Sequence, residues 1–84
     1  MQIKQICNNK ATIVYHNKKR YLFSYDTLML SSYYDANIAD YVYIRHFKNQ
    51  SLLSNTTLRH VREFMSVDHV KRDEIMKLKY KEVA

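Results

Sequence analysis

The chain of 84 residues has no glycine and no proline. Loops that hold phosphate, such as the P-loop and the dinucleotide fingerprint, need glycine because the backbone must approach the ligand closely. The G-x-S-x-G elbow of acyl-transfer enzymes is excluded for the same reason. Turns with a positive φ must then fall to asparagine and aspartate, which tolerate the left-handed region best. We expect such turns at Asn8, Asn9, Asn17, Asn37 and Asn49.

Cysteine and long apolar runs are also scarce. A single cysteine, Cys7, excludes an intrachain disulfide. No apolar run approaches the ~18 residues of a membrane span, and no secretory segment follows Met1. Hydrophobic residues nevertheless make up 46% of the chain, too many for a disordered tail. We therefore expect a single domain, 1–84, that is cytoplasmic and has no membrane partner.

Polar and apolar residues alternate along the first half of the chain. A period of two, filled with β-branched and aromatic side chains, predicts strands. The segments with this pattern are 2–7, 11–16, 20–25, a run marked by Leu28, Leu30 and Tyr34, and 41–47. On the third segment Tyr21, Phe23 and Tyr25 would share one face. The connections are too short for parallel crossovers, so residues 1–50 are predicted to form an antiparallel meander.

The pattern changes after residue 51. Ser54 and the two residues after it are good N-cap types, and an apolar stripe at helical spacing follows. The stripe consists of Leu58, Val61, Phe64 and Met65. These features predict a helix over about 55–66 that packs its stripe on one face of the sheet.

A second helix is predicted from a cap at Ser66 or Asp68 toward the end of the chain. Its basis is the recurrence of Met76, Tyr80 and Val83 at i, i+4 and i+7. Residues 54–84 thus form the helical part. The predicted fold is α+β, with an antiparallel sheet of four to five strands followed by two C-terminal helices.

Positive charge is in excess, with 14 Lys and Arg against 8 Asp and Glu, a net charge of +6. Such charge attracts nucleic acid, with an affinity that falls with salt, and it equally attracts an acidic protein surface. It is also compatible with an ordinary solvated face. The candidate contact cations are Lys18, Lys19, Arg20, Arg59, Arg62, Lys71 and Arg72.

Tyrosine is abundant: eight tyrosines accompany three phenylalanines and no tryptophan. Tyrosine offers a large, stiff contact area with a polar tip, which suits protein interfaces and base stacking. It also packs well on a half-buried sheet face. Tyr33 and Tyr34 are the candidate contact residues, because on a strand one of two adjacent side chains must leave the core face.

Metal and catalytic groups show no recognisable constellation. The histidines are His16, His46, His60 and His69, and they do not have zinc-site spacing with one another or with Cys7. A nucleophile–base pair of Cys7 and His16 would depend on the fold to bring them together. We expect no catalytic residue, no metal and no cofactor. A small ribonuclease that uses only Lys, Arg, His and Tyr is an alternative.

The start of the predicted helix has two interpretations. Thr56 and Thr57 can satisfy the free N–H groups of the first turn, which makes the segment a structural cap. Alternatively, these N–H groups and Arg59 form an anion site for a phosphate.

Two short sequence motifs carry a resemblance to a known family. They are SYDT at 24–27 and S-x-T-T-x-x-H-x-x-x-F at 54–64. They resemble a small family of uncharacterised domains from phages and plasmids of Gram-positive bacteria, over about residues 20–65. The resemblance implies an accessory protein of a mobile element in the cytoplasm of a bacterial host. Small non-catalytic phage proteins often block or redirect a host machine, and anti-CRISPR inhibitors are one such group.

These observations predict a binding protein and not an enzyme. We expect it to bind and block a host nucleoprotein or defence complex, as an anti-CRISPR inhibitor would, through its cations and tyrosines. A basic nucleic-acid-binding regulator is the first alternative, with Arg59, Arg62, Lys71 and Arg72 on the phosphates of DNA or RNA. An RNase-type toxin is the second alternative. Exposed strand edges are compatible with a homodimer.

Overall fold

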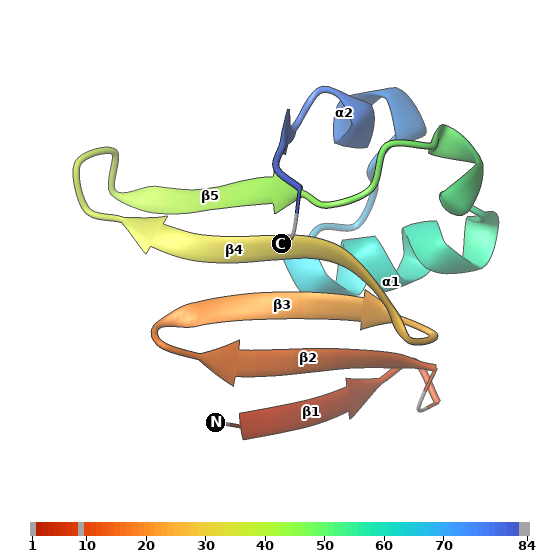
Figure 1. The fold of residues 1–84 in the computed structure, drawn as a ribbon, viewed down its shortest axis with the longest axis horizontal. Coiled ribbons are helices and arrows are strands. Elements are labelled where there is room, and N and C mark those ends of the chain that lie inside the picture. The colour runs from red at the N-terminus through yellow and green to blue at the C-terminus, as the bar shows by residue number, and fades with distance from the viewer. Residues whose placement is uncertain (1, 9, 83–84) are drawn as a thin grey trace.

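Six strands form one sheet whose spatial order follows the sequence, as Figure 1 shows. The computed structural model describes residues 2–8 and 10–82. The strands are β1 (Gln2–Ile6), β2 (Ala11–His16), β3 (Lys19–Ser24), β4 (Thr27–Asp35), β5 (Asp40–Arg45) and β6 (Lys79–Tyr80). The first five are antiparallel, each paired with the next, so the predicted meander is confirmed.

One α-helix crosses a face of this sheet, behind β3 and β4 in the view of Figure 1. After a short 3-10 turn, η1 (Gln50–Leu52), α1 runs over Asn55–Met65 and α2 over Arg72–Met76. Ser54 caps α1, because its Oγ accepts the backbone N–H of Thr57 at 3.2 Å. Ser66 ends the helix in the left-handed region with φ 57°. The predicted α+β fold and the predicted first helix are confirmed.

The predicted second helix is present as α2, but the prediction that it runs to the end of the chain is wrong. α2 has five residues, and Lys79–Tyr80 then forms β6, parallel to β5. The backbone N–H of Lys81 donates to the carbonyl of Arg45 at 3.0 Å. The edge of β5 offers unpaired backbone groups, and pairing with it outweighs a weak helical pattern. Both helices lie in the connection from β5 to the parallel β6, which is a crossover outside the predicted meander. Val83 lies outside the described residues.

More residue types than expected adopt the left-handed backbone conformation, with a positive φ. Asn8 and Asn17 adopt it, with φ values of 57° and 51°, but Asn37 and Asn49 do not. The other residues with positive φ are Cys7, Lys18, Tyr25, Ala39 and Ser66. The position within a tight turn sets φ, so in a chain without glycine the residue at that position must adopt it at a cost of about 1–3 kcal/mol. Asn9 lies outside the described residues.

Tyr25 is one of these turn residues and is not on the third strand. β3 ends at Ser24, and Tyr25 begins the two-residue turn to β4 with φ 51°. The expectation that Tyr25 shares a face with Tyr21 and Phe23 is therefore wrong. The turn directs its ring to the start of α1, where it lies 5.6 Å from the ring of His60, centroid to centroid.

The β2–β3 turn provides a test of this turn chemistry. His16 pairs with Lys19, and both intervening residues have positive φ, which is the type I′ geometry that prefers Asn-Gly. We expect Lys18→Gly to raise the free energy of unfolding by about 0.5–1 kcal/mol, because glycine relieves the strain at φ 65°. Urea denaturation measures this change. Lys77→Gly is the matched control, since Lys77 has φ −82° and should lose stability; a loss of stability in Lys18→Gly would contradict the prediction.

The core lies between the sheet and α1. Leu22 of β3 and Leu30 of β4 pair with each other and are fully buried. The predicted helical stripe packs against this face, with Leu58, Val61 and Phe64 buried and Met65 partly buried. This expectation is therefore confirmed. Phe47, Leu53, Val70 and Ile75 belong to the same core.

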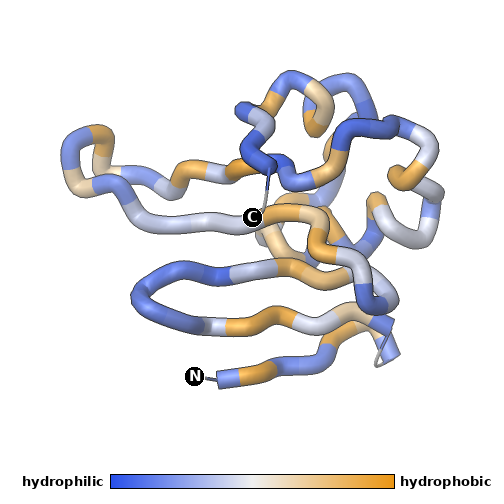
Figure 2. The backbone as a smooth tube through the Cα atoms, in the orientation of Figure 1, coloured by the Kyte–Doolittle hydropathy of each residue, from blue (hydrophilic) through white to orange (hydrophobic). Residues whose placement is uncertain are grey.

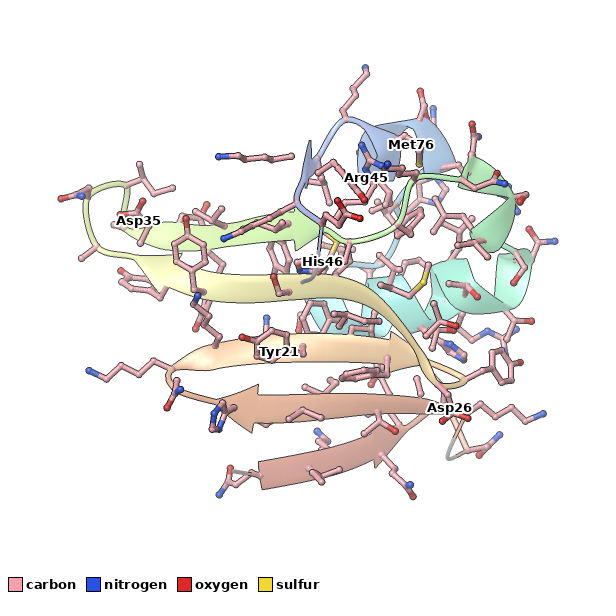
Figure 3. The ribbon with its side chains drawn as sticks, in the orientation of Figure 1. Tyr21, Asp26, Asp35, Arg45, His46 and Met76 are labelled. Atoms are coloured by element: carbon pink, nitrogen blue, oxygen red, sulfur yellow. The ribbon has the colours of Figure 1, made fainter. Side chains whose placement is uncertain are left out.

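The opposite face of the sheet carries no helix within residues 2–8 and 10–82. Tyr21 stands on this face in Figure 3. Figure 2 shows apolar residues alternating with polar ones along the strands, which is the pattern of a sheet covered on one side. Neither helix of the described chain is long and apolar enough to cross a membrane.

Candidate functional site

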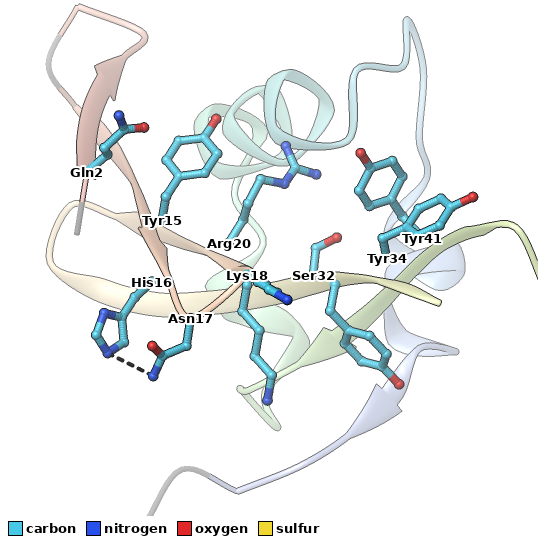
Figure 4. A pocket seen from close by; sticks show the side chains of 11 residues that line it. Gln2, Tyr15, His16, Asn17, Lys18, Arg20, Ser32, Tyr34 and Tyr41 are labelled. Atoms are coloured by element: carbon cyan, nitrogen blue, oxygen red, sulfur yellow. Dashed lines mark hydrogen bonds between the residues drawn. The ribbon is translucent and has the colours of Figure 1, made fainter. Parts of the chain in front are cut away.

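Five of the predicted binding residues line one cleft beside the β2–β3 turn, shown in Figure 4. They are Lys18, Lys19, Arg20, Tyr33 and Tyr34. The other six lining residues were not predicted as binding residues; they are Gln2, Tyr15, His16, Asn17, Ser32 and Tyr41. The cleft has a volume of about 580 Å³, and no aspartate or glutamate lines it. We call these eleven residues the tyrosine cleft.

Strand pairing brings these side chains together. Arg20 lies opposite Tyr15 on one side and Ser32 on the other, and opposed residues of antiparallel strands point to the same face. That face is the one that packs on α1, but the sheet extends past the helix at this end, as Figure 1 shows. The uncovered end of the face becomes the floor of the cleft.

Arg20 is held by aromatic rings and carbonyl and hydroxyl oxygens, with no carboxylate in the lining. Its guanidinium carbon lies 4.6 Å from the ring centroid of Phe64 and 5.5 Å from that of Tyr41. Its Nη1 donates to the Phe64 carbonyl at 3.4 Å, and its Nη2 donates to the hydroxyl of Tyr43 at 3.5 Å. Both hydrogen bonds are long, so the positive charge of Arg20 is positioned without being neutralised.

Two buried polar atoms in this region lack a hydrogen-bond partner among the described residues. They are Nε of Arg20 and Oγ of Ser32, which come from directly opposed positions on β3 and β4. Buried polar atoms are normally paired, so an unpaired donor and an unpaired hydroxyl side by side favour an added acceptor between them. An approaching carbonyl, carboxylate or phosphate oxygen, or a water, has the required chemistry.

Tyr34 and Tyr41 form the outer wall of the cleft. Their rings meet edge to face, 5.4 Å apart at 76°, and the two residues are 55% and 51% exposed. The adjacent Tyr33 points to the opposite face of the sheet and is half-buried. The expectation that one tyrosine of this pair leaves the core face is therefore confirmed, and the wall offers stiff aromatic area to a partner.

The other predicted cations do not join the cleft. They are Arg59, Arg62, Lys71 and Arg72. Arg72 serves the fold, because its Nε donates to the Leu53 carbonyl at 2.6 Å and its Nη2 to Oδ1 of Asn55 at 2.7 Å. These two bonds fix α2 against the start of α1. Arg59 lines a separate pocket near the start of α1.

The two sequence motifs at 24–27 and 54–64 contact each other in the folded protein. Oγ of Ser24 lies 2.8 Å from Nδ1 of His60 and 3.2 Å from Oγ1 of Thr57, and all three residues are buried. The hydroxyl of Ser54 in turn donates to Oγ1 of Thr57 at 3.2 Å. This chain of hydrogen bonds fastens the end of β3 to the first turn of α1. The interpretation of the segment as a structural cap is confirmed for Ser54.

Burial lowers the pKa of His60, and the positive charges of Arg59 and Lys10 lower it further. The unfolded chain therefore takes up a proton on this histidine at a higher pH than the folded protein does. We expect the free energy of unfolding to fall as the pH drops below about 6.5, the ordinary value, toward the lowered pKa of the folded state. Above that value the effect vanishes.

Urea denaturation between about pH 7.5 and 5.5 measures this dependence. His60→Gln should be less stable than the wild type at neutral pH but should lose less stability on acidification. His69→Gln, at an exposed histidine, is the control and should follow the wild type. An equal loss on acidification in His60→Gln and the wild type would contradict a role for His60.

Cys7 lies in the β1–β2 turn and His16 at the far end of β2, so the fold does not join them as a nucleophile and base. Cys7 instead lines the same pocket as His60. Burial and the negative charge of Glu63 raise the pKa of the Cys7 thiol, although Arg59 opposes them. A raised pKa disfavours the reactive thiolate. Within the described residues, no three His, Cys, Asp or Glu side chains are placed to hold a metal ion.

These observations define a small α+β domain with a cationic, tyrosine-rich cleft at one end of its sheet. The chain belongs to a family of unknown function, DUF8033, whose match covers residues 1–82. A search of curated proteins and a search of solved structures found no match. The family membership states no origin and no activity.

Proposed function

We propose that this protein is a non-catalytic binding protein of a phage or other mobile element. It acts in the cytoplasm of a bacterial host, where it occupies a surface of a nucleoprotein or defence complex, as an anti-CRISPR inhibitor does. The tyrosine cleft carries the proposal, because it combines Lys18, Lys19 and Arg20 with the rings of Tyr15, Tyr34 and Tyr41 and has no carboxylate in its lining. The proposed origin from a mobile element rests on the two sequence motifs alone.

The residue types of the cleft suit a protein or nucleoprotein surface. Arginine and tyrosine are enriched at the energetic centres of interfaces, where they fill pockets and lose water. The lysines at the rim increase the rate of encounter with an acidic or phosphate-rich partner. The exposed Tyr34 and Tyr41 supply the flat apolar area, and their hydroxyls supply the polar edge.

Affinity capture from lysate of a bacterial host tests this function. The bait variants are Lys18→Glu/Lys19→Glu in the cleft and Lys77→Glu/Lys79→Glu as a control, which removes the same charge from exposed positions elsewhere. We expect the wild type and the control to retain one stoichiometric partner that the cleft variant loses. Equal recovery with all three baits, or recovery with none, would contradict the proposal.

Direct nucleic-acid binding is the second candidate, because tyrosines flanked by lysines also fit stacked bases and phosphates. Digestion of the lysate with nucleases before capture separates the two. A protein partner remains bound after digestion, whereas a nucleic-acid partner is lost. A gel shift with a steep salt dependence would favour the nucleic acid.

His16 also lies in the cleft, so the same samples should be checked for RNA cleavage, which would indicate the toxin alternative.

A further inference from the structure

A second cation-rich pocket lies at the opposite end of the sheet from the tyrosine cleft. It has a volume of about 230 Å³ and lies where the β1–β2 turn, the β3–β4 turn and the start of α1 meet, at the right of Figure 1. Its lining residues are Cys7, Asn8, Lys10, Tyr25, Thr56, Arg59 and His60. None of them is acidic. We call it the His60 pocket.

The hydrogen-bond chain can run in one direction that makes His60 a donor to this pocket. Ser54 uses its hydroxyl proton on Thr57, so the proton of Thr57 is free for Ser24. The hydroxyl of Ser24 then donates to Nδ1 of His60. With Nδ1 as an acceptor, the neutral ring carries its proton on Nε2. In this arrangement the chain ends in an N–H donor.

Nε2 of His60 has no hydrogen bond to another described residue. His60 is 1% exposed, it hydrogen-bonds Ser24 through Nδ1, and its ring lines the pocket. An N–H donor that faces a pocket can bind an acceptor there. Lys10 and Arg59 add two positive charges to the same pocket, so the acceptor should be an anion.

We propose that the His60 pocket binds the phosphate group of a nucleotide. Nε2–H of His60 donates to a phosphate oxygen, and Lys10 and Arg59 supply the opposing charge. Tyr25 favours a nucleotide over free phosphate, because it is 52% exposed and its ring lies beside the pocket, against the ring of His60. The outer face of that ring is available to stack on a base.

The charges around His60 show how binding can be detected. Lys10 faces the ring from the β1–β2 turn, Arg59 lies on its own helix, and both lower its pKa. Cys7 and Tyr25 are the other titratable groups in the lining, and Glu63 acts on Cys7 without lining the pocket. A bound phosphate opposes the two positive charges, so it should raise the pKa of His60.

NMR titration of the ¹⁵N-labelled full chain tests the site with inorganic phosphate, adenosine monophosphate and O-phosphoserine, at constant ionic strength held with chloride. We expect the His60 ring to show the Nε2–H form and to shift with phosphate, with a raised pKa. Adenosine monophosphate should bind at least about fivefold more tightly than inorganic phosphate, because base stacking adds about 1 kcal/mol or more. O-Phosphoserine should bind no more tightly than inorganic phosphate.

Two helix variants make the test specific. Arg59→Gln should weaken binding by about tenfold, the effect expected for one charge-assisted hydrogen bond, and it leaves the buried chain intact. Arg62→Gln, three residues along α1 and outside the pocket, should stay close to the wild type. A His60 ring that does not respond, or equal effects of both variants, would overturn the site. Equal affinity for the nucleotide and O-phosphoserine would overturn the nucleotide. Both outcomes are independent of the tyrosine cleft, which shares no residue with this pocket.

Discussion

Phe64→Ala is expected to lower the free energy of unfolding by about 3–5 kcal/mol, a large share of the stability of a domain this small. Phe64 is 1% exposed in the core between α1 and the sheet. Its ring meets that of Tyr43 edge to face at 6.0 Å and lies below the guanidinium of Arg20. Alanine removes the apolar contacts and leaves a cavity that the strands cannot close.

Chemical denaturation followed by circular dichroism measures this loss. Met65→Ala, at the neighbouring half-buried position, is the control and should cost far less. Phe64→Leu keeps most of the volume and should cost less than about 1.5 kcal/mol. A Phe64→Ala variant within about 1 kcal/mol of the wild type would show that α1 does not pack on the sheet in this way.

The strands and the first helix could be predicted because each has a strong local signal. Alternation along 11–16 and 20–24 and the cap at Ser54 specify their own structure before any long-range contact forms. The end of the chain has no such signal. Lys79–Tyr80 becomes a strand only because the edge of β5 lies within reach, and the edge is a property of the assembled sheet. Helical spacing of Met76 and Tyr80 therefore gave the wrong prediction.

For the same reason, only part of the candidate site could be predicted from the sequence. Lys18, Lys19 and Arg20 are neighbours in the sequence, so a cluster of cations at a hairpin tip was predictable. Tyr15, Ser32 and Tyr41 reach the cleft through the register of four strands, which composition and spacing do not reveal. Likewise, the sequence shows that residue 72 is an arginine, but it does not show that its side chain donates a hydrogen bond to the carbonyl of Leu53.

The tyrosine wall of the cleft should contribute strongly to affinity for the captured complex. We expect Tyr34→Ala/Tyr41→Ala to weaken binding by about a hundredfold, because two interface tyrosines typically contribute more than 1 kcal/mol each. Both side chains are more than half exposed, at 55% and 51%, so the substitutions should leave the fold intact.

Surface plasmon resonance with the captured complex measures the dissociation constant. Tyr25→Ala is the matched control, since Tyr25 is 52% exposed but lies at the other end of the sheet. It should bind the complex as tightly as the wild type. If Tyr25→Ala weakens binding as much as the double variant does, the contact is not confined to the tyrosine cleft.

The most direct test of the central claim is a lysine-reactivity footprint of the protein alone and in the complex captured from lysate. Acetylation followed by mass spectrometry reports the accessibility of each lysine separately. If the tyrosine cleft forms the contact, Lys18 and Lys19 lose reactivity in the complex, while Lys77 and Lys79 react as they do in the free protein. Protection of Lys77 and Lys79 with Lys18 and Lys19 still reactive would contradict it.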